Sequence, residues 1–165
     1  MSKLSIIASI IVAIILTGCQ ATHYVPKKYN VKNEIVINSS KSQAWSKVIE
    51  WYGKVNLTPS VMDQSSGYLQ ASFTLGKNFN DYCDCGYVKG GLESFYFENI
   101  QGRFNVTLYP VSEYQTRVRL NMTVSSDLNG YSFDKYRGWY LSSSSRINCN
   151  SIGTLEESLI NELAR

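Results

Sequence analysis

The chain has 165 residues, of which 44% are hydrophobic and 18% are charged, and its formal net charge is +3. This length suits one domain with a sizeable core. A charge this small and dispersed argues against nucleic acid as a partner.

The first residues have the composition of an export signal. Lys3 supplies a positive start, and residues 6–16 form an unbroken run of apolar or small residues that is too short to span a bilayer as a helix. The run ends in Leu16-Thr17-Gly18-Cys19, which resembles the lipobox of bacterial lipoprotein precursors. The resemblance implies that residues 1–18 are a signal peptide and that Cys19 carries the lipid, including palmitate. An ordinary secretory signal that contains a cysteine is the alternative.

The lipobox also implies a location. Acyl chains on Cys19 would anchor the protein to a membrane without a transmembrane helix. Gln20 follows the cysteine where inner-membrane lipoproteins commonly have aspartate, which implies the outer membrane, with the domain facing the periplasm. Residues 19–33 are polar and contain Pro26, so they are predicted to form a flexible tether.

Residues 34–165 are predicted to form one domain that begins with a strand and a helix. The β-branched run at residues 34–38 predicts the strand. Ser40 and Gln43 have the spacing of a capping box, in which each side chain satisfies an amide of the other residue. The helix is expected to end at Gly53 and to bury one stripe of side chains: Ala44, Val48, Trp51 and Tyr52.

Strands are predicted where apolar and polar residues alternate. The expected strands cover residues 55–62, 69–75, 95–100, 104–108 and 116–124. The last two flank a short turn, which predicts an antiparallel hairpin with one face toward water. Residues 126–148 show no such alternation and are predicted to be irregular.

A second helix is predicted at the C-terminal end of the sequence. Thr154 and Glu157 match another capping box, and Leu155, Leu159 and Leu163 recur at helical spacing. Two helices and one antiparallel sheet predict an α+β fold, in which the sheet packs against both helices as a two-layer sandwich.

The order of these elements and the stretch SKSQAWSKVIEWYG…SSGYLQASF resemble the helix-grip fold, in which a curved sheet wraps a C-terminal helix. That fold occurs in the small lipoprotein subunit of the outer-membrane β-barrel assembly machinery and in START-like lipid-binding domains. The resemblance concerns the fold and specifies no activity.

Three cysteines remain for an oxidising compartment: Cys83, Cys85 and Cys149. A bridge between Cys83 and Cys85 would need an unusually tight ring, so either of them is a partner for Cys149. The segments DCG and CNSIGTLE resemble paired segments of uncharacterised bacterial lipoproteins, which implies the pair Cys85–Cys149. No metal or other cofactor is expected, because His23, the only histidine, falls in the predicted tether.

The sequence does not predict an enzyme. With His23 in the tether, no Ser-His-Asp or Cys-His arrangement is expected in the domain, and no P-loop, GxGxxG or HExxH motif occurs. Ser132-Phe-Asp-Lys135 matches SxxK but lacks the partner motifs of that chemistry. The remaining candidates for catalysis are carboxylate pairs: Glu93 with Glu98, or Asp81 with Asp84.

Residues 129–146, NGYSFDKYRGWYLSSSSR, interleave aromatic and basic side chains. Tyr, Trp and Arg dominate binding hot spots, because they bury a large area with little loss of entropy. The candidate partner-binding residues are Tyr131, Phe133, Tyr136, Arg137, Trp139 and Tyr140. The alternative is that these aromatic side chains cover a sheet edge or the core.

Two functions follow as hypotheses. The first is a non-enzymatic envelope lipoprotein, a membrane-tethered binding or accessory module for an envelope protein complex. The second is a carrier of a small apolar ligand, held in a helix-grip pocket around Phe73, Leu120 and Leu159.

Overall fold

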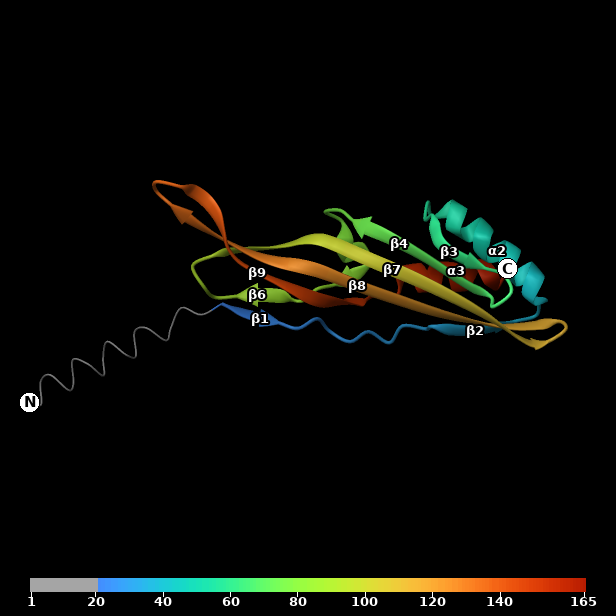
Figure 1. Cartoon of the computed structure of the whole chain (residues 1–165). Coiled ribbons are helices and arrows are strands. Elements are labelled where there is room, and N and C mark those ends of the chain that lie inside the picture. Colours follow the sequence, from blue (N-terminus) through green and yellow to red (C-terminus); the bar gives the residue numbers. More distant parts are fainter. Residues whose placement is uncertain (1–20) are drawn as a thin grey trace, which may run out of the picture.

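The structure is a computed structural model and describes residues 21–165 (Figure 1). The expected signal peptide and Cys19 lie outside the described residues. The helices are α2 (Lys41–Lys54), α3 (Thr154–Leu163) and the short 3-10 helix η1 (Phe79–Asp81). The strands are β1 (Thr22–Tyr24), β2 (Glu34–Ile37), β3 (Pro59–Asp63), β4 (Tyr68–Leu75), β5 (Cys83–Asp84), β6 (Tyr87–Lys89), β7 (Ser94–Ser112), β8 (Gln115–Asp134) and β9 (Gly138–Ser151).

Most of the strands form one antiparallel sheet. Its order is β3-β4-β7-β8-β9-β5, and β2 pairs with β8 beyond the end of β9. The short strands β1 and β6 pair with each other as a separate antiparallel pair. This mostly-sheet structure with two helices confirms the α+β class.

Helix α2 forms as its sequence predicts. The Ser40 hydroxyl accepts from the backbone N–H of Gln43, and the Gln43 side chain accepts from the N–H of Ser40, so the capping box is confirmed. The helix continues to Lys54, one residue past the glycine at which it was expected to end. Its predicted apolar stripe is buried against the sheet.

The main core lies between the helices and the sheet. Trp51 of α2 packs against Phe104 of β7, with ring centroids 5.4 Å apart. The Trp51 indole Nε1–H donates to Ser158 Oγ of α3 at 3.0 Å, and the Tyr52 hydroxyl donates to the Phe104 carbonyl oxygen at 3.2 Å. These bonds satisfy the polar ends of two large buried aromatic residues and fix α2 to both α3 and the sheet.

The hairpin of β7 and β8 has one buried and one wet face, as predicted. Val106, Leu120 and their buried neighbours face the helices. Arg117 and Arg119 are exposed on the opposite face, where both pair with Glu34 of β2. Exposed ion pairs of this kind contribute little to stability, so this face is mainly solvated.

The prediction that residues 126–148 are irregular is wrong. Strand β8 continues to Asp134, and β9 pairs with it from Asp134↔Gly138 to Val124↔Cys149. The strands expected at 95–100 and 104–108 are likewise one strand, β7, with a bulge between Glu98 and Gln101. A bulge leaves one residue unpaired without ending a strand, and this interrupts the alternation in the sequence.

The second predicted capping box is also wrong. The N-cap of α3 is Gly153, in the left-handed conformation at φ 99°, and no side chain caps the helix. The Thr154 hydroxyl donates instead to the Asp81 carbonyl oxygen at 2.6 Å. Thr154 therefore makes a tertiary contact with η1 and does not cap its own helix.

The structure differs from the tether expected over residues 19–33. Within the described part, His23 pairs with Val88 in the ladder of β1 and β6. Farther along, the Lys27 N–H donates to Asp84 Oδ2 at 3.1 Å, and the Asn150 amide donates to the Lys27 carbonyl oxygen at 2.7 Å. The segment is polar because it crosses the surface of the domain, where its backbone groups find partners. No helix among residues 21–165 is long and apolar enough to cross a membrane.

Candidate functional site

The aromatic hairpin, which we define as residues 129–146, projects from the body of the sheet (Figure 1). Its turn is held by Asp134, whose Oδ1 accepts from the backbone N–H groups of Tyr136 at 2.8 Å and Arg137 at 3.0 Å. Gly138 takes the positive φ of 74° that closes the turn. The hairpin is thus a folded element rather than a loose loop.

The structure brings all six candidate residues together on this hairpin. Phe133 and Trp139 face each other across the strands, with ring centroids 5.6 Å apart and edge-on geometry. Phe133 is 63% exposed, Trp139 is 64% exposed and Tyr136 is 84% exposed. These side chains do not cover the core. The exposed arrangement favours a binding surface over the covering role.

A hollow of about 350 Å³ lies at the base of the hairpin. It is lined by Tyr96 and Glu98 of β7, Tyr131 of β8 and Trp139 of β9. The rings of Tyr96 and Tyr131 meet edge-on at 6.0 Å. The sequence did not single out Tyr96, because only the register Ser94↔Tyr131 of the unpredicted strand extension brings β7 beside the hairpin.

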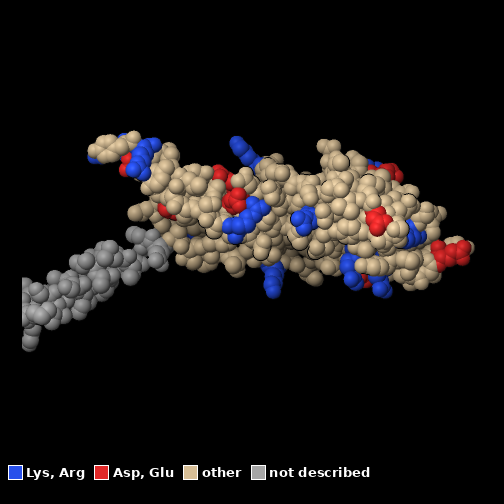
Figure 2. Space-filling model, in the orientation of Figure 1, with Lys and Arg blue, Asp and Glu red and all other residues tan. Residues whose placement is uncertain are grey.

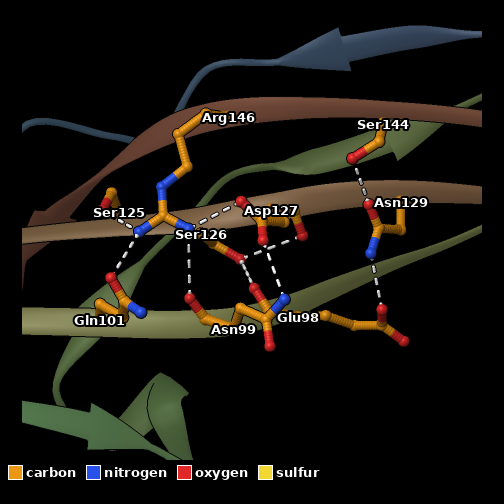
Figure 3. A network of polar contacts seen from close by, with 9 residues as sticks. All are labelled: Glu98, Asn99, Gln101, Ser125, Ser126, Asp127, Asn129, Ser144 and Arg146. Carbon is orange, nitrogen blue, oxygen red and sulfur yellow. Dashed lines mark hydrogen bonds and ion pairs between the residues drawn. The ribbon is translucent and has the colours of Figure 1, made fainter.

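The Glu98 side chain lines this hollow, and its carboxylate accepts hydrogen bonds there (Figure 3). Its Oε2 accepts from the Asn129 amide at 2.6 Å and from the Tyr131 hydroxyl at 3.0 Å, and the Ser144 hydroxyl in turn donates to Asn129 at 2.6 Å. The bond to the carboxylate raises the pKa of Tyr131. No described residue hydrogen-bonds to the other carboxylate oxygen, Oε1, which leaves an acceptor for a ligand group.

Arg146 ties the three strands of the hairpin base together (Figure 3). Its guanidinium donates to Asp127 at 2.7 Å and Ser125 at 2.7 Å on β8, and to Gln101 at 3.2 Å on β7. The bond from Arg146 keeps the pKa of Asp127 below its ordinary value. Arg146, which the sequence places among the interleaved basic residues, is thus engaged within the sheet, whereas no described acidic residue pairs with Lys135 or Arg137.

The hairpin also has an open backbone edge. Strand β5 pairs with β9 only at Asn150 and Ser151, so in the described chain no strand lies beside residues 138–148 on that edge. The opposite edge of the sheet is the short β3, which starts at Pro59. Proline and short length are common protections of an edge strand, and β9 lacks both.

Cys85 and Cys149 form a disulfide, the pairing that the resemblance implied, with Cα atoms 4.2 Å apart. It lies one position beyond the last paired residues of β5 and β9, Asp84↔Asn150. Cys83 is free and buried, and burial raises the pKa of its thiol to about 11. The three sulfur atoms lie within 4.8 Å of one another.

No metal is expected from the sequence because His23 falls in the predicted tether, and that reason is wrong. His23 Nε2 lies 2.9 Å from the carbonyl oxygen of Cys85, to which it donates, because a carbonyl only accepts. With Cys85 and Cys149 joined, Cys83 alone of the three keeps a thiol. The donors that remain are one protonated thiol and an imidazole whose Nε2 is engaged, a poor set for zinc.

The groups considered for catalysis have other partners. Glu93 accepts from the hydroxyls of Ser132 at 3.4 Å and Ser143 at 3.0 Å. Asp84 accepts from the Gly86 N–H at 2.7 Å, which shapes the cysteine loop. Lys135 of the SxxK match lies over the ring of Tyr136 at 4.7 Å, and Ser132 donates to Glu93.

The residues proposed for an apolar pocket separate into two groups. Leu120 and Leu159 are fully buried in the packed core. Phe73 instead lines a hollow of about 430 Å³ beside the start of α3, together with Leu57, Leu75, Tyr82 and Leu155. The hollow that Phe73 lines therefore lies at this edge, and neither Leu120 nor Leu159 lines it.

Comparison with known protein families found no family model that matches this chain, and a search of curated proteins found no relative.

Proposed function

We propose that this chain is a non-enzymatic lipoprotein of the outer membrane that faces the periplasm and binds a protein partner through the aromatic hairpin, as an accessory module of an envelope complex. The lipobox resemblance supports the anchor at Cys19 and the location. The observation that carries the binding role is the hairpin itself. Its large aromatic side chains stand in water on a turn fixed by Asp134, although burying them in the core would have stabilised the domain.

Three features support a protein as the partner. The hollow at the hairpin base offers aromatic walls and the free acceptor of Glu98. The network around Arg146 holds the strands in place before binding, which limits the entropy lost on association. The open edge of β9 offers backbone groups to an extended segment of a partner.

The helix-grip arrangement belongs to the same proposal. Helix α3 is the C-terminal element and packs against both β8 and α2, with Leu159 fully buried. In a two-layer sandwich of this kind, the end of the long strands away from α2 and α3 carries no helix. The aromatic hairpin extends from that end (Figure 1).

Replacing Tyr96, a wall of the hollow at the hairpin base, with alanine should weaken binding of the partner by about 2 kcal/mol or more, the size of an aromatic hot spot. Because the side chain is 56% exposed, the free energy of unfolding should change by only about 0.5 kcal/mol or less. The measurement is co-purification from detergent-solubilised envelopes, followed by titration of the recovered partner.

Tyr114→Ala is the matched control. Tyr114 is also an exposed tyrosine, but it lies in the turn that joins β7 to β8 at the other end of the sheet. The control variant should bind as the unmodified chain does. Recovery of no specific partner with any variant would contradict the proposal.

The second candidate function is carriage of a small apolar ligand. The hollow around Phe73 favours it, because its walls are largely apolar and its size is that of a small-molecule site. Leu155→Trp should fill this hollow and abolish the adduct that native mass spectrometry of gently extracted protein would show. A spectrum of the unmodified chain without any adduct counts against the carrier.

A further inference from the structure

We propose that the tip of the aromatic hairpin, together with the loop at residues 90–92, docks on an anionic lipid surface. This inference rests on the proposed lipid anchor at Cys19 and goes beyond it, because it assigns a second membrane contact to the folded domain. Tyr96, Tyr131 and Glu98 at the base of the hairpin are left for the protein partner.

The first step is the place where the chain meets the domain. Thr22 pairs with Lys89, and Ala21 lies so close to Gly91 that a Cβ on Gly91 would stand 2.9 Å from the Ala21 Cβ. Cys19 precedes Ala21 by two residues, and two residues of extended chain span at most about 7 Å. An acylated Cys19 therefore holds the end of the domain that contains Gly91 against the bilayer.

The second step places the hairpin at that same end. Glu93 follows Gly91 by two residues, and its carboxylate accepts from Ser132 of β8 and Ser143 of β9. Figure 1 shows the hairpin tip and the start of β1 at one end of the elongated molecule, with the C-terminus and α2 at the other. The tip extends past Tyr131 by three more residue pairs, or about 10 Å of strand.

The third step is the chemistry of the tip. Tyr and Trp are enriched where a membrane meets water, because their rings are apolar and carry a polar group. Trp139, Tyr136 and Phe133 are exposed here, and Leu92, in the neighbouring loop after two glycines, is 90% exposed. Such side chains dock on a lipid interface without needing a pocket, which suits a projecting tip.

The charge at the tip has the matching sign. Lys135 and Arg137 flank Tyr136, and no described acidic side chain forms an ion pair with either of them. Figure 2 shows basic side chains beside an acidic one at the projecting tip, where Lys135 and Arg137 outnumber Asp134. Cations near a membrane surface are attracted by anionic headgroups, so the tip fits a lipid surface that carries such headgroups.

The tryptophans provide the test. Trp45 and Trp51 are buried, at 8% and 2% exposure, so Trp139 is the tryptophan that a quencher outside the domain can reach. The acylated chain, purified in detergent, is placed in vesicles of phosphatidylcholine and phosphatidylglycerol, with and without bromine on the acyl chains. We expect brominated lipid to remove the Trp139 part of the emission and Trp139→Phe to remove this loss.

A matched reporter controls for simple proximity to the vesicle. Tyr114→Trp in the Trp139→Phe background moves an exposed tryptophan to the turn between β7 and β8, and its emission should be insensitive to bromine. Replacing Lys135 and Arg137 with glutamine should reduce quenching of Trp139 in anionic vesicles.

Equal Trp139 emission in brominated and ordinary vesicles would overturn the lipid contact, as would full quenching of Trp139 by aqueous acrylamide on the vesicles. Shielding of Trp139 that occurs only after envelope proteins are added would also overturn it, in favour of a protein surface. Flotation of the chain with the vesicles reports the Cys19 anchor, and co-purification reports the partner, so failure of the proposed function is seen separately.

Discussion

Replacing Phe104 with alanine should lower the free energy of unfolding by about 3–5 kcal/mol. Phe104 is 0% exposed in the middle of β7, and its ring packs against Trp51 at 5.4 Å and Tyr52 at 6.4 Å. Both partners belong to α2, so the ring joins that helix to the sheet. Alanine would leave a cavity, because the backbone of β7 is paired on both sides and cannot move in to fill it.

Urea denaturation followed by circular dichroism measures this loss, and Phe133→Ala is its matched control. The control makes the same chemical change at a side chain that is 63% exposed on the hairpin, so it should alter stability by about 0.5 kcal/mol or less. Similar losses in the two variants would contradict the exposed position of the hairpin.

Opening the disulfide should lower the free energy of unfolding by a similar amount, about 4 kcal/mol in the chain-entropy model. Cys85 and Cys149 are separated by 64 positions, and joining them restricts the unfolded chain far more than the folded one. The bond fastens β5 to β9 beside two paired positions, Cys83↔Ser151 and Asp84↔Asn150, in a small buried cluster that includes Ile100 and Val124.

Denaturation of the unmodified chain with and without reducing agent isolates the cross-link from changes in side-chain volume. The variant with alanine at both Cys85 and Cys149 should be insensitive to the reducing agent. Cys83→Ala should keep the full response, because Cys83 is not in the bond. A reduced chain as stable as the oxidised one would contradict the prediction.

The helices show how far local patterns determine this fold. The Ser40–Gln43 box and the apolar stripe of α2 need no information beyond one turn of helix, and both are found. At α3 the apolar stripe is right and the cap is wrong, because Thr154 bonds to Asp81, which no local pattern reveals. The burial of a helix was therefore more predictable than the way it begins.

The strands of the aromatic hairpin could not be predicted from the sequence, for a different reason. Alternation marks a strand only when one face is buried, and Ser142, Ser144 and Ser145 are exposed on an edge strand. Their regular structure comes from pairing with β8, and the bulge between Glu98 and Gln101 shifts the register on the other side. The aromatic residues of the site were found from composition, whereas Tyr96 required the register itself.

The N-terminal segment illustrates a third limit. Its polar composition and Pro26 predicted a tether, yet β1 lies in a ladder with β6, and Gly86 approaches the Tyr24 carbonyl so closely that no side chain would fit there. Gly86 has φ 79°, which also favours glycine. Composition describes how well a segment interacts with water, but not whether its backbone has found a partner.

The third thiol has a consequence for how the native bond survives. Thiol–disulfide exchange requires a thiolate, and Cys83 lies within 4.8 Å of both sulfur atoms that it could attack. Burial raises the pKa of Cys83 to about 11, so its thiol stays protonated at neutral pH. The fold therefore keeps the nearest competing thiol unreactive as long as the packing around Cys83 holds.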